Sequence, residues 1–166
     1  MSMNGTFRAL PDEELDALRA DPSRVEQLLY ASFFGNGTNG HDELEVDKAW
    51  HGLHFLLTGT AWEGDFPLNF IVSGGEEVGD DLGYGPARGL TSGDVQKIDA
   101  ALEPFTRDEL GRRFDAERMT ALEIYPFGWS DDPNGELDYL LDFYADLRAF
   151  VRRTAEREHA LLVYLS

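Results

Sequence analysis

The last third of the chain constrains the fold most, because a long helical pattern there leads directly into a strand that is apolar on both faces. The residues from about Glu136 to Glu158 predict the longest helix. Its apolar residues form two adjacent stripes at helical spacing, namely Leu137, Leu140, Leu141, Tyr144, Leu147 and Val151, and Tyr139, Phe143 and Phe150. An apolar arc of this width packs against more than one neighbour. The next residues, Ala160 to Leu165 (ALLVYL), predict an interior strand, since both of its faces need cover.

The rest of the chain alternates short strand patterns with amphipathic helices. Strands are predicted at Thr6 to Leu10, Leu68 to Ser73 and Ala87 to Leu90. Helices are predicted to start at Pro11 and Pro22 and to span about 47–58, 92–102, 107–114 and 116–124. Helices outnumber strands, so we predict a single α+β domain over residues 1–166, with a small mixed sheet of about four strands packed against six or seven helices.

The charge of the chain excludes several classes of function. Its 166 residues include 32 acidic and 14 basic side chains, which gives a net charge of −18. Nucleic acids and anionic lipids are recruited by clusters of Lys and Arg, so neither is expected as a partner. With 42% hydrophobic residues the chain has enough apolar surface to fold. The absence of cysteine excludes disulfides and thiol catalysis.

The sequence pattern shows no targeting or membrane segment. The start MSMNGTFRALPDEE has neither the basic region nor the apolar region of a secretory signal. No apolar run approaches the roughly 18 residues that a membrane span needs. We therefore expect a soluble, cytoplasmic protein.

The helix predicted at 47–58 carries the first candidate site. Spacings of three and four residues put four polar side chains on one face, opposite a buried stripe of Trp50, Leu53 and Leu57: Asp47, His51, His54 and Thr58. Two histidines with an acid one turn earlier suit a divalent metal or an acid–base pair. Asp47 also suits a helix N-cap, and the histidines also suit hydrogen bonds at the edge of the core. We favour this structural interpretation and predict no metal, because the helix supplies no third strong ligand. Glu76 or Glu77 would supply one only if the glycine-rich segment that follows folds over this helix.

A glycine-rich segment, Gly74 to Arg88 (GGEEVGDDLGYGPAR), carries the second candidate site. Its glycines allow tight turns and a close approach of a ligand to the backbone. A dinucleotide-binding loop is excluded, since the segment opens no helix and its acids repel phosphate. The acids suit a cation, although a solvated turn explains them as well: Glu76, Glu77, Asp80 and Asp81. Tyr84 and Arg88 are best suited to a specific contact, although Arg88 is equally suited to neutralising the nearby acids.

Several of these stretches resemble the YfbM-like family, a bacterial domain family of unknown function. The resemblance rests on DKAWHGLHFLLTG (Asp47 to Gly59), GGEEVGDDLGYGPAR (Gly74 to Arg88) and LLVYLS (Leu161 to Ser166), and the opening strand followed by PDEELDALRADP also fits. It covers essentially the whole chain. It implies a single α+β domain and does not indicate any particular activity. The loop GNGTNGH (Gly35 to His41) departs from the family pattern and suggests a variable insertion.

Two hypotheses for the function follow, and we favour the first. It is a non-catalytic binding or interaction module, regulatory or immunity-type, whose acidic surface recruits a basic protein partner. The alternative is a small-molecule-binding protein or an enzyme, with a pocket between the 47–58 helix and the Gly74–Arg88 segment. The predicted binding residues are Asp47, Trp50, His51, His54, Glu76, Glu77, Tyr84 and Arg88. No catalytic residue and no cofactor is predicted, and the chain suits a monomer or a homodimer.

Overall fold

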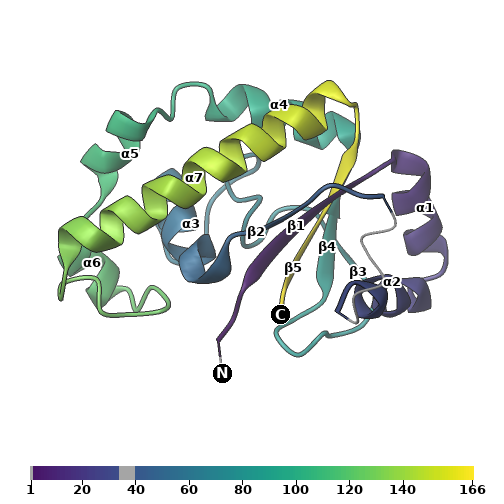
Figure 1. Ribbon diagram of the computed structural model, residues 1–166, viewed down its shortest axis with the longest axis horizontal. Coiled ribbons are helices and arrows are strands. Elements are labelled where there is room, and N and C mark those ends of the chain that lie inside the picture. The colour runs from purple at the N-terminus through teal and green to yellow at the C-terminus, as the bar shows by residue number, and fades with distance from the viewer. Residues whose placement is uncertain (1, 34–39) are drawn as a thin grey trace.

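The computed structural model describes residues 2–33 and 40–166, which fold around one five-stranded sheet (Figure 1). Its strands are β1 (Gly5–Leu10), β2 (Glu43–Glu45), β3 (Glu76–Val78), β4 (Ala87–Leu90) and β5 (Ala160–Leu165). They lie in the order β2-β1-β5-β4-β3, and every pairing is antiparallel. The C-terminal strand β5 is therefore the centre of the sheet.

Helices cover both faces of this sheet. Figure 1 shows α1 (Asp12–Ala20) and α2 (Ser23–Phe33) on one side of it, and the remaining helices on the other. The second group comprises α3 (Trp50–Thr58) with a preceding 3₁₀ turn η1 (Asp47–Ala49), α4 (Ser92–Leu102), α5 (Arg107–Arg113), α6 (Ala116–Ala121) and α7 (Pro133–Glu156). Within the described ranges, no helix combines the length and the apolar character that crossing a membrane requires.

Alternate residues of β5 pack into two separate cores. Leu161 and Val163 join the larger core, which α3, α4 and α7 complete. Leu162 and Tyr164 join the smaller core, which α1 and α2 complete. Successive side chains of a strand point to opposite faces, so this arrangement confirms the prediction of an interior strand that is apolar on both sides.

The predicted start of α4 agrees with the structure, and a polar cap marks it. Thr91 accepts a hydrogen bond from the Asp94 amide, and the Asp94 carboxylate accepts one from the Thr91 amide, which completes the predicted capping box of α4. The long helix α7 is confirmed, but it begins at Pro133 rather than at 136. Asp132 caps it by accepting from the Gly135 amide, and a proline is favoured in the first turn.

The strand predicted at Leu68 to Ser73 is wrong. This segment folds as consecutive turns, in which the amides of Val72, Ser73 and Gly74 all donate to the Asn69 carbonyl. Its most apolar side chains are buried as the pattern indicated. A short apolar run predicts burial, whereas the backbone conformation depends on what partners its amides and carbonyls find.

The α+β class is confirmed with a sheet that differs in two details from the predicted one. It has five strands rather than about four, and it is antiparallel rather than mixed. The two strands that the sequence did not reveal, β2 and β3, have three residues each and lie at the two edges. Both are acidic and too short to show an alternating pattern. Most of the predicted GNGTNGH insertion, 35–39, lies outside the described residues.

Candidate functional site

A pocket of about 200 Å³ lies between α3, the glycine-rich segment and the end of β5. Four of the eight predicted binding residues line it: Trp50, Glu77, Tyr84 and Arg88. The remaining walls come from Trp62, Ile71, Val72, Gly85, Pro86, Val163, Tyr164 and Leu165. The sheet register explains part of this grouping, because Glu77 lies opposite Arg88 on β4, and Arg88 lies opposite Val163 on β5. These three side chains share one face of the sheet.

Arg88 forms one wall of the pocket, and most of its hydrogen bonds go to backbone carbonyls. Its Nη1 donates to the carbonyls of Phe70, at 3.1 Å, and of Gly74, and its Nη2 donates to the Ile71 carbonyl at 2.6 Å. Burial lowers the pKa of Arg88 to about 10, against an opposing effect of Glu77, so the guanidinium stays charged at neutral pH. With three of its five N–H donors used in this way, Arg88 shapes the pocket more than it serves a ligand.

Aromatic rings form the opposite wall. The rings of Trp50 and His51 stack with 5.0 Å between centroids, and Trp62 covers His51 at 4.2 Å. Trp50 is buried, and its Nε1 donates to the Met3 carbonyl at 2.9 Å. Trp62 is 55% exposed, so it presents an aromatic face to solvent at the mouth of the pocket.

His51 and His54 lie behind this wall, and both side chains are fully buried. The Tyr125 amide donates to Nδ1 of His51 at 2.9 Å, so the ring proton lies on Nε2 and is donated to the Ala61 carbonyl at 2.8 Å. Nε2 of His54 donates to the Glu63 carbonyl at 2.9 Å. The predicted polar face of α3 is therefore covered by the loop that follows the helix, and its histidines hold that loop.

Burial also sets the charge of these two rings. It lowers the pKa of His51, while the hydrogen bond to Ala61 opposes the change. It lowers the pKa of His54 from 6.5 to about 4, and the nearby charges of His51 and Arg88 add to the effect. General acid–base catalysis is most efficient when the pKa lies near the working pH. At neutral pH both rings act instead as uncharged hydrogen-bond donors.

Asp47 and Glu76 lie away from the pocket. Asp47 has a left-handed backbone with φ of 49°, and its carboxylate accepts a hydrogen bond from the Tyr139 hydroxyl of α7 at 2.8 Å. Neither η1 nor α3 has a side-chain cap, so the suggested N-cap role of Asp47 is wrong. Glu76 faces the other side of the sheet from Glu77 and lies 3.6 Å from Arg19 of α1. These contacts join η1 to α7 and β3 to α1, and neither side chain lines the pocket.

Trp62 is the pocket residue that the sequence patterns did not reveal. It follows α3 in the loop WEGD, outside any helical or alternating pattern. No sequence signal marks it, because a single aromatic side chain in a polar loop is ordinary. Its exposure depends on where the loop folds back over His51, which only the structure shows.

The pocket offers aromatic faces, the Glu77 carboxylate and the Tyr84 phenol to a ligand. Such a set suits a positively charged group, which aromatic faces and carboxylates both attract. In the part of the chain that the structure describes, no three His, Cys, Asp or Glu side chains are placed to hold a metal ion.

Comparison with known proteins places this fold in a family. The family model described as Domain of unknown function (DUF1877) matches residues 1–164. The chain belongs to the DUF1877 family. It is 31% identical over 156 residues to Protein YfbM of Escherichia coli (strain K12), which covers 86% of this chain and 92% of that protein. The crystal structure of YfbM from Escherichia coli, described as a protein of unknown function, matches with a TM-score of 0.74 at 25% identity, over 98% of this chain and 99% of that chain. The YfbM-like resemblance is thus confirmed.

Proposed function

We propose that this member of the DUF1877 family is a non-catalytic binding module that anchors an Arg or Lys side chain of a basic protein partner beside Trp62. The supporting observation is the composition of the pocket. The rings of Trp50, Trp62 and Tyr84 and the Glu77 carboxylate surround a space of about 200 Å³. A cation over an aromatic face gains about 0.5–2 kcal/mol, and a carboxylate adds a charge-assisted hydrogen bond.

The surface around the pocket carries the matching charge. Between Lys48 and Arg88 the chain contains six acidic residues and no Lys or Arg, and this stretch includes α3, β3 and most of the pocket lining. Many of the arginines elsewhere face their own acids. Arg148 and Arg152, for example, both contact Asp99. Arg88 is the basic residue of the pocket lining, and its guanidinium is held by backbone carbonyls. The acids of this stretch remain in excess, and this excess would steer a basic partner to this face.

The size of the pocket favours a single side chain over a whole small molecule. Sites for small ligands usually measure about 300–1,000 Å³, and this pocket is smaller, at about 200 Å³. An enzyme at this place has less support, because His51 and His54 are buried and hydrogen-bonded to the carbonyls of Ala61 and Glu63. We therefore place the binding module ahead of the small-molecule or enzymatic alternative.

Titration of ¹⁵N-labelled protein with a short peptide rich in Arg and Lys tests this proposal. The expected chemical-shift changes gather at Trp62, Glu77 and Tyr84. The affinity is expected to fall as salt is raised from about 0.05 M to about 0.5 M, because the screening length shrinks several-fold. Trp62→Ala and Glu77→Gln are each expected to weaken binding by about threefold to tenfold, in line with one partly exposed cation contact.

Matched control variants separate the pocket from general acidity. Tyr30→Ala removes an aromatic ring that is 61% exposed on α2, and Asp146→Asn removes an exposed acid of α7. Both are expected to keep the affinity of the parent protein. Equal binding by the pocket variants and the control variants would show that overall charge attracts the peptide, and the proposal would then be wrong.

A further inference from the structure

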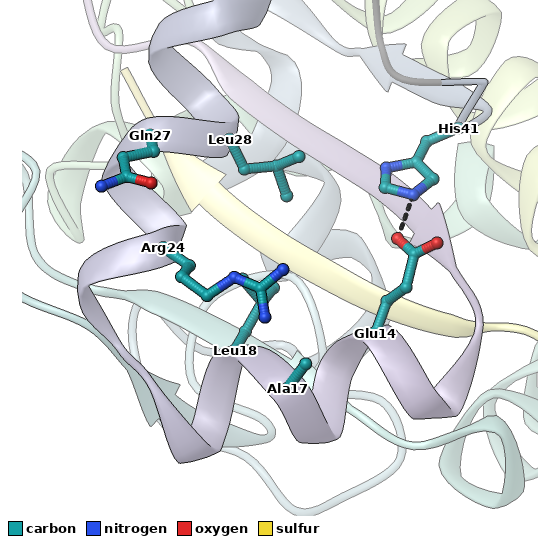
Figure 2. Close-up of a pocket in the computed structure, with 7 residues that line it drawn as sticks. All are labelled: Glu14, Ala17, Leu18, Arg24, Gln27, Leu28 and His41. Atoms are coloured by element: carbon teal, nitrogen blue, oxygen red, sulfur yellow. Dashed lines mark hydrogen bonds and ion pairs between the residues drawn. The ribbon is translucent and has the colours of Figure 1, made fainter.

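A second pocket, of about 450 Å³, lies between α1, α2 and His41 (Figure 2). It belongs to the opposite side of the sheet from the pocket beside Trp62, because α1 and α2 pack on the smaller core. Its volume falls within the range of about 300–1,000 Å³ that small-molecule sites occupy. None of the residues predicted from the sequence lines it.

One end of this pocket is fixed by a chain of hydrogen bonds that starts inside the protein. Arg8 is fully buried, and its Nε donates to Nδ1 of His41 at 3.0 Å. Because Nδ1 accepts, the ring proton lies on Nε2, which donates to the Glu14 carboxylate. Arg8 is itself held near Glu43, at 3.6 Å from Nη1 to the carboxylate. The His41 side chain is only 6% exposed, whereas that of Glu14 is 52% exposed. A buried network thus holds an acid in a set position at the pocket wall.

The other end of the pocket carries the positive charge of Arg24, for which the described residues provide no ion pair. Figure 2 shows Arg24 of α2 reaching into the space between the two helices, with Glu14 and His41 at the far end. Among the residues that the structure describes, no acidic side chain forms an ion pair with Arg24. Gln27 lies one turn further along α2 and adds amide donors and an acceptor.

The space between these ends has apolar walls. Ala17 and Leu18 of α1 face Leu28 of α2 across the pocket. The pocket therefore presents an acid at one end, a base at the other, and aliphatic side chains between them.

We propose that this pocket binds a small zwitterion with an apolar side chain, of the free amino-acid class. The ammonium group would meet Glu14, the carboxylate would meet Arg24 and Gln27, and the apolar side chain would lie against Leu18 and Leu28. A ligand with only a negative charge would face Glu14 and a protein of net charge −18, and a ligand with only a positive charge would face Arg24. A zwitterion satisfies both ends at once. The site is separate from the pocket beside Trp62, so it does not depend on the proposed function.

Calorimetric and NMR titrations with defined compounds test the proposal. L-Leucine and L-phenylalanine are expected to bind, with shift changes on α1 and α2. N-acetyl-L-leucine lacks the ammonium group, L-leucine amide lacks the carboxylate, and glycine lacks the apolar side chain. Each is expected to bind about tenfold or more weakly than L-leucine, since each leaves one charged or apolar contact unmade.

Variants of the two charged ends provide the second arm of the test. Arg24→Gln and Glu14→Gln are each expected to weaken L-leucine binding by about tenfold or more. Glu13→Gln, which changes an exposed acid next to Glu14, and Arg118→Gln, which changes an exposed base on α6, are expected to leave it unchanged. If Glu14→Gln does not fold, Arg24→Gln decides alone, because its side chain supports no described ion pair. Absence of binding by both amino acids up to about 10 mM, equal binding of N-acetyl-L-leucine, or equal binding by Arg24→Gln would each overturn the proposal.

Discussion

The charge state of His54 makes the stability of the protein depend on pH in a range that can be stated. Its side chain is fully buried, its Nε2 donates to the Glu63 carbonyl, and no hydrogen-bond partner for its Nδ1 lies among the described residues. Burial lowers the pKa of His54 from 6.5 to about 4. Between these two pH values the unfolded chain binds a proton at His54 that the folded chain does not bind. The free energy of unfolding therefore rises with pH through this range.

The magnitude follows from the same two values. At about 1.4 kcal/mol for each pH unit of difference between the folded and unfolded states, a pKa that falls from 6.5 to about 4 corresponds to about 3 kcal/mol. This stability is fully present above pH 6.5, decreases as the pH falls, and is lost at about pH 4. A domain of ordinary stability has about 5–15 kcal/mol, so the loss is a large share of the total.

Denaturant unfolding of the parent protein and of His54→Gln measures this contribution. Glutamine keeps an N–H donor for the Glu63 carbonyl and does not titrate. Between pH 7 and pH 4, the parent is expected to lose about 3 kcal/mol more than the variant, measured by tryptophan fluorescence. The carboxylates and His51 titrate in both proteins, so their effects cancel in the difference. Equal losses in the two proteins, or an NMR titration midpoint of His54 near 6.5, would refute the reasoning.

Two further substitutions test how the pocket and its neighbouring helix are held. Arg88→Lys keeps a positive charge but loses the planar guanidinium that donates to three carbonyls. The free energy of unfolding, measured by urea titration, is expected to fall by about 2–4 kcal/mol. Arg118→Lys, on the exposed face of α6, is the control and is expected to leave this free energy unchanged. Thr91→Ala removes the cap that accepts from the Asp94 amide and is expected to lower the thermal midpoint through a loss of about 1 kcal/mol, whereas Thr91→Ser is expected to retain most of it. A Thr91→Ser variant as unstable as Thr91→Ala would show that the methyl group matters more than the cap.

Local signals in the sequence were sufficient for the parts of the fold that depend on neighbours in the chain. The capping box of Thr91 and Asp94, the apolar stripes of α7 and the two-sided apolar run of β5 all act within a few residues, and the structure confirms them. The edge strands β2 and β3 could not be found in this way. Each has only three residues and pairs with a strand whose position is set by the rest of the sheet.

The backbone conformation of the segment 68–73 also could not be predicted from local sequence signals. Its apolar side chains correctly indicated burial, but the carbonyls of Phe70 and Ile71 accept from the guanidinium of Arg88, about 18 residues further along the chain. The sequence carries no mark of that contact. Arg88 lies beside Glu77 through the pairing of β3 with β4, which the sequence did not reveal either.

The candidate site was predicted in part, because helical spacing fixes which side chains share a face and not what covers that face. His51 and His54 do share a face of α3, but Trp62 and the loop carbonyls close over it. Asp47 leaves that face altogether because its left-handed backbone turns its carboxylate to Tyr139.

The central strand keeps the two proposed sites apart, and this makes them separable by experiment. Arg88 lies opposite Val163 of β5, and Arg8 lies opposite Leu162, so the two arginines belong to opposite faces of the sheet. A substitution that merely loosened the fold would weaken both kinds of binding together. Glu77→Gln should therefore weaken the basic peptide and leave L-leucine unaffected, and Arg24→Gln should do the reverse. A common loss in both variants would point to β5 and the fold as a whole, whereas the crossed result would assign each ligand to its own face.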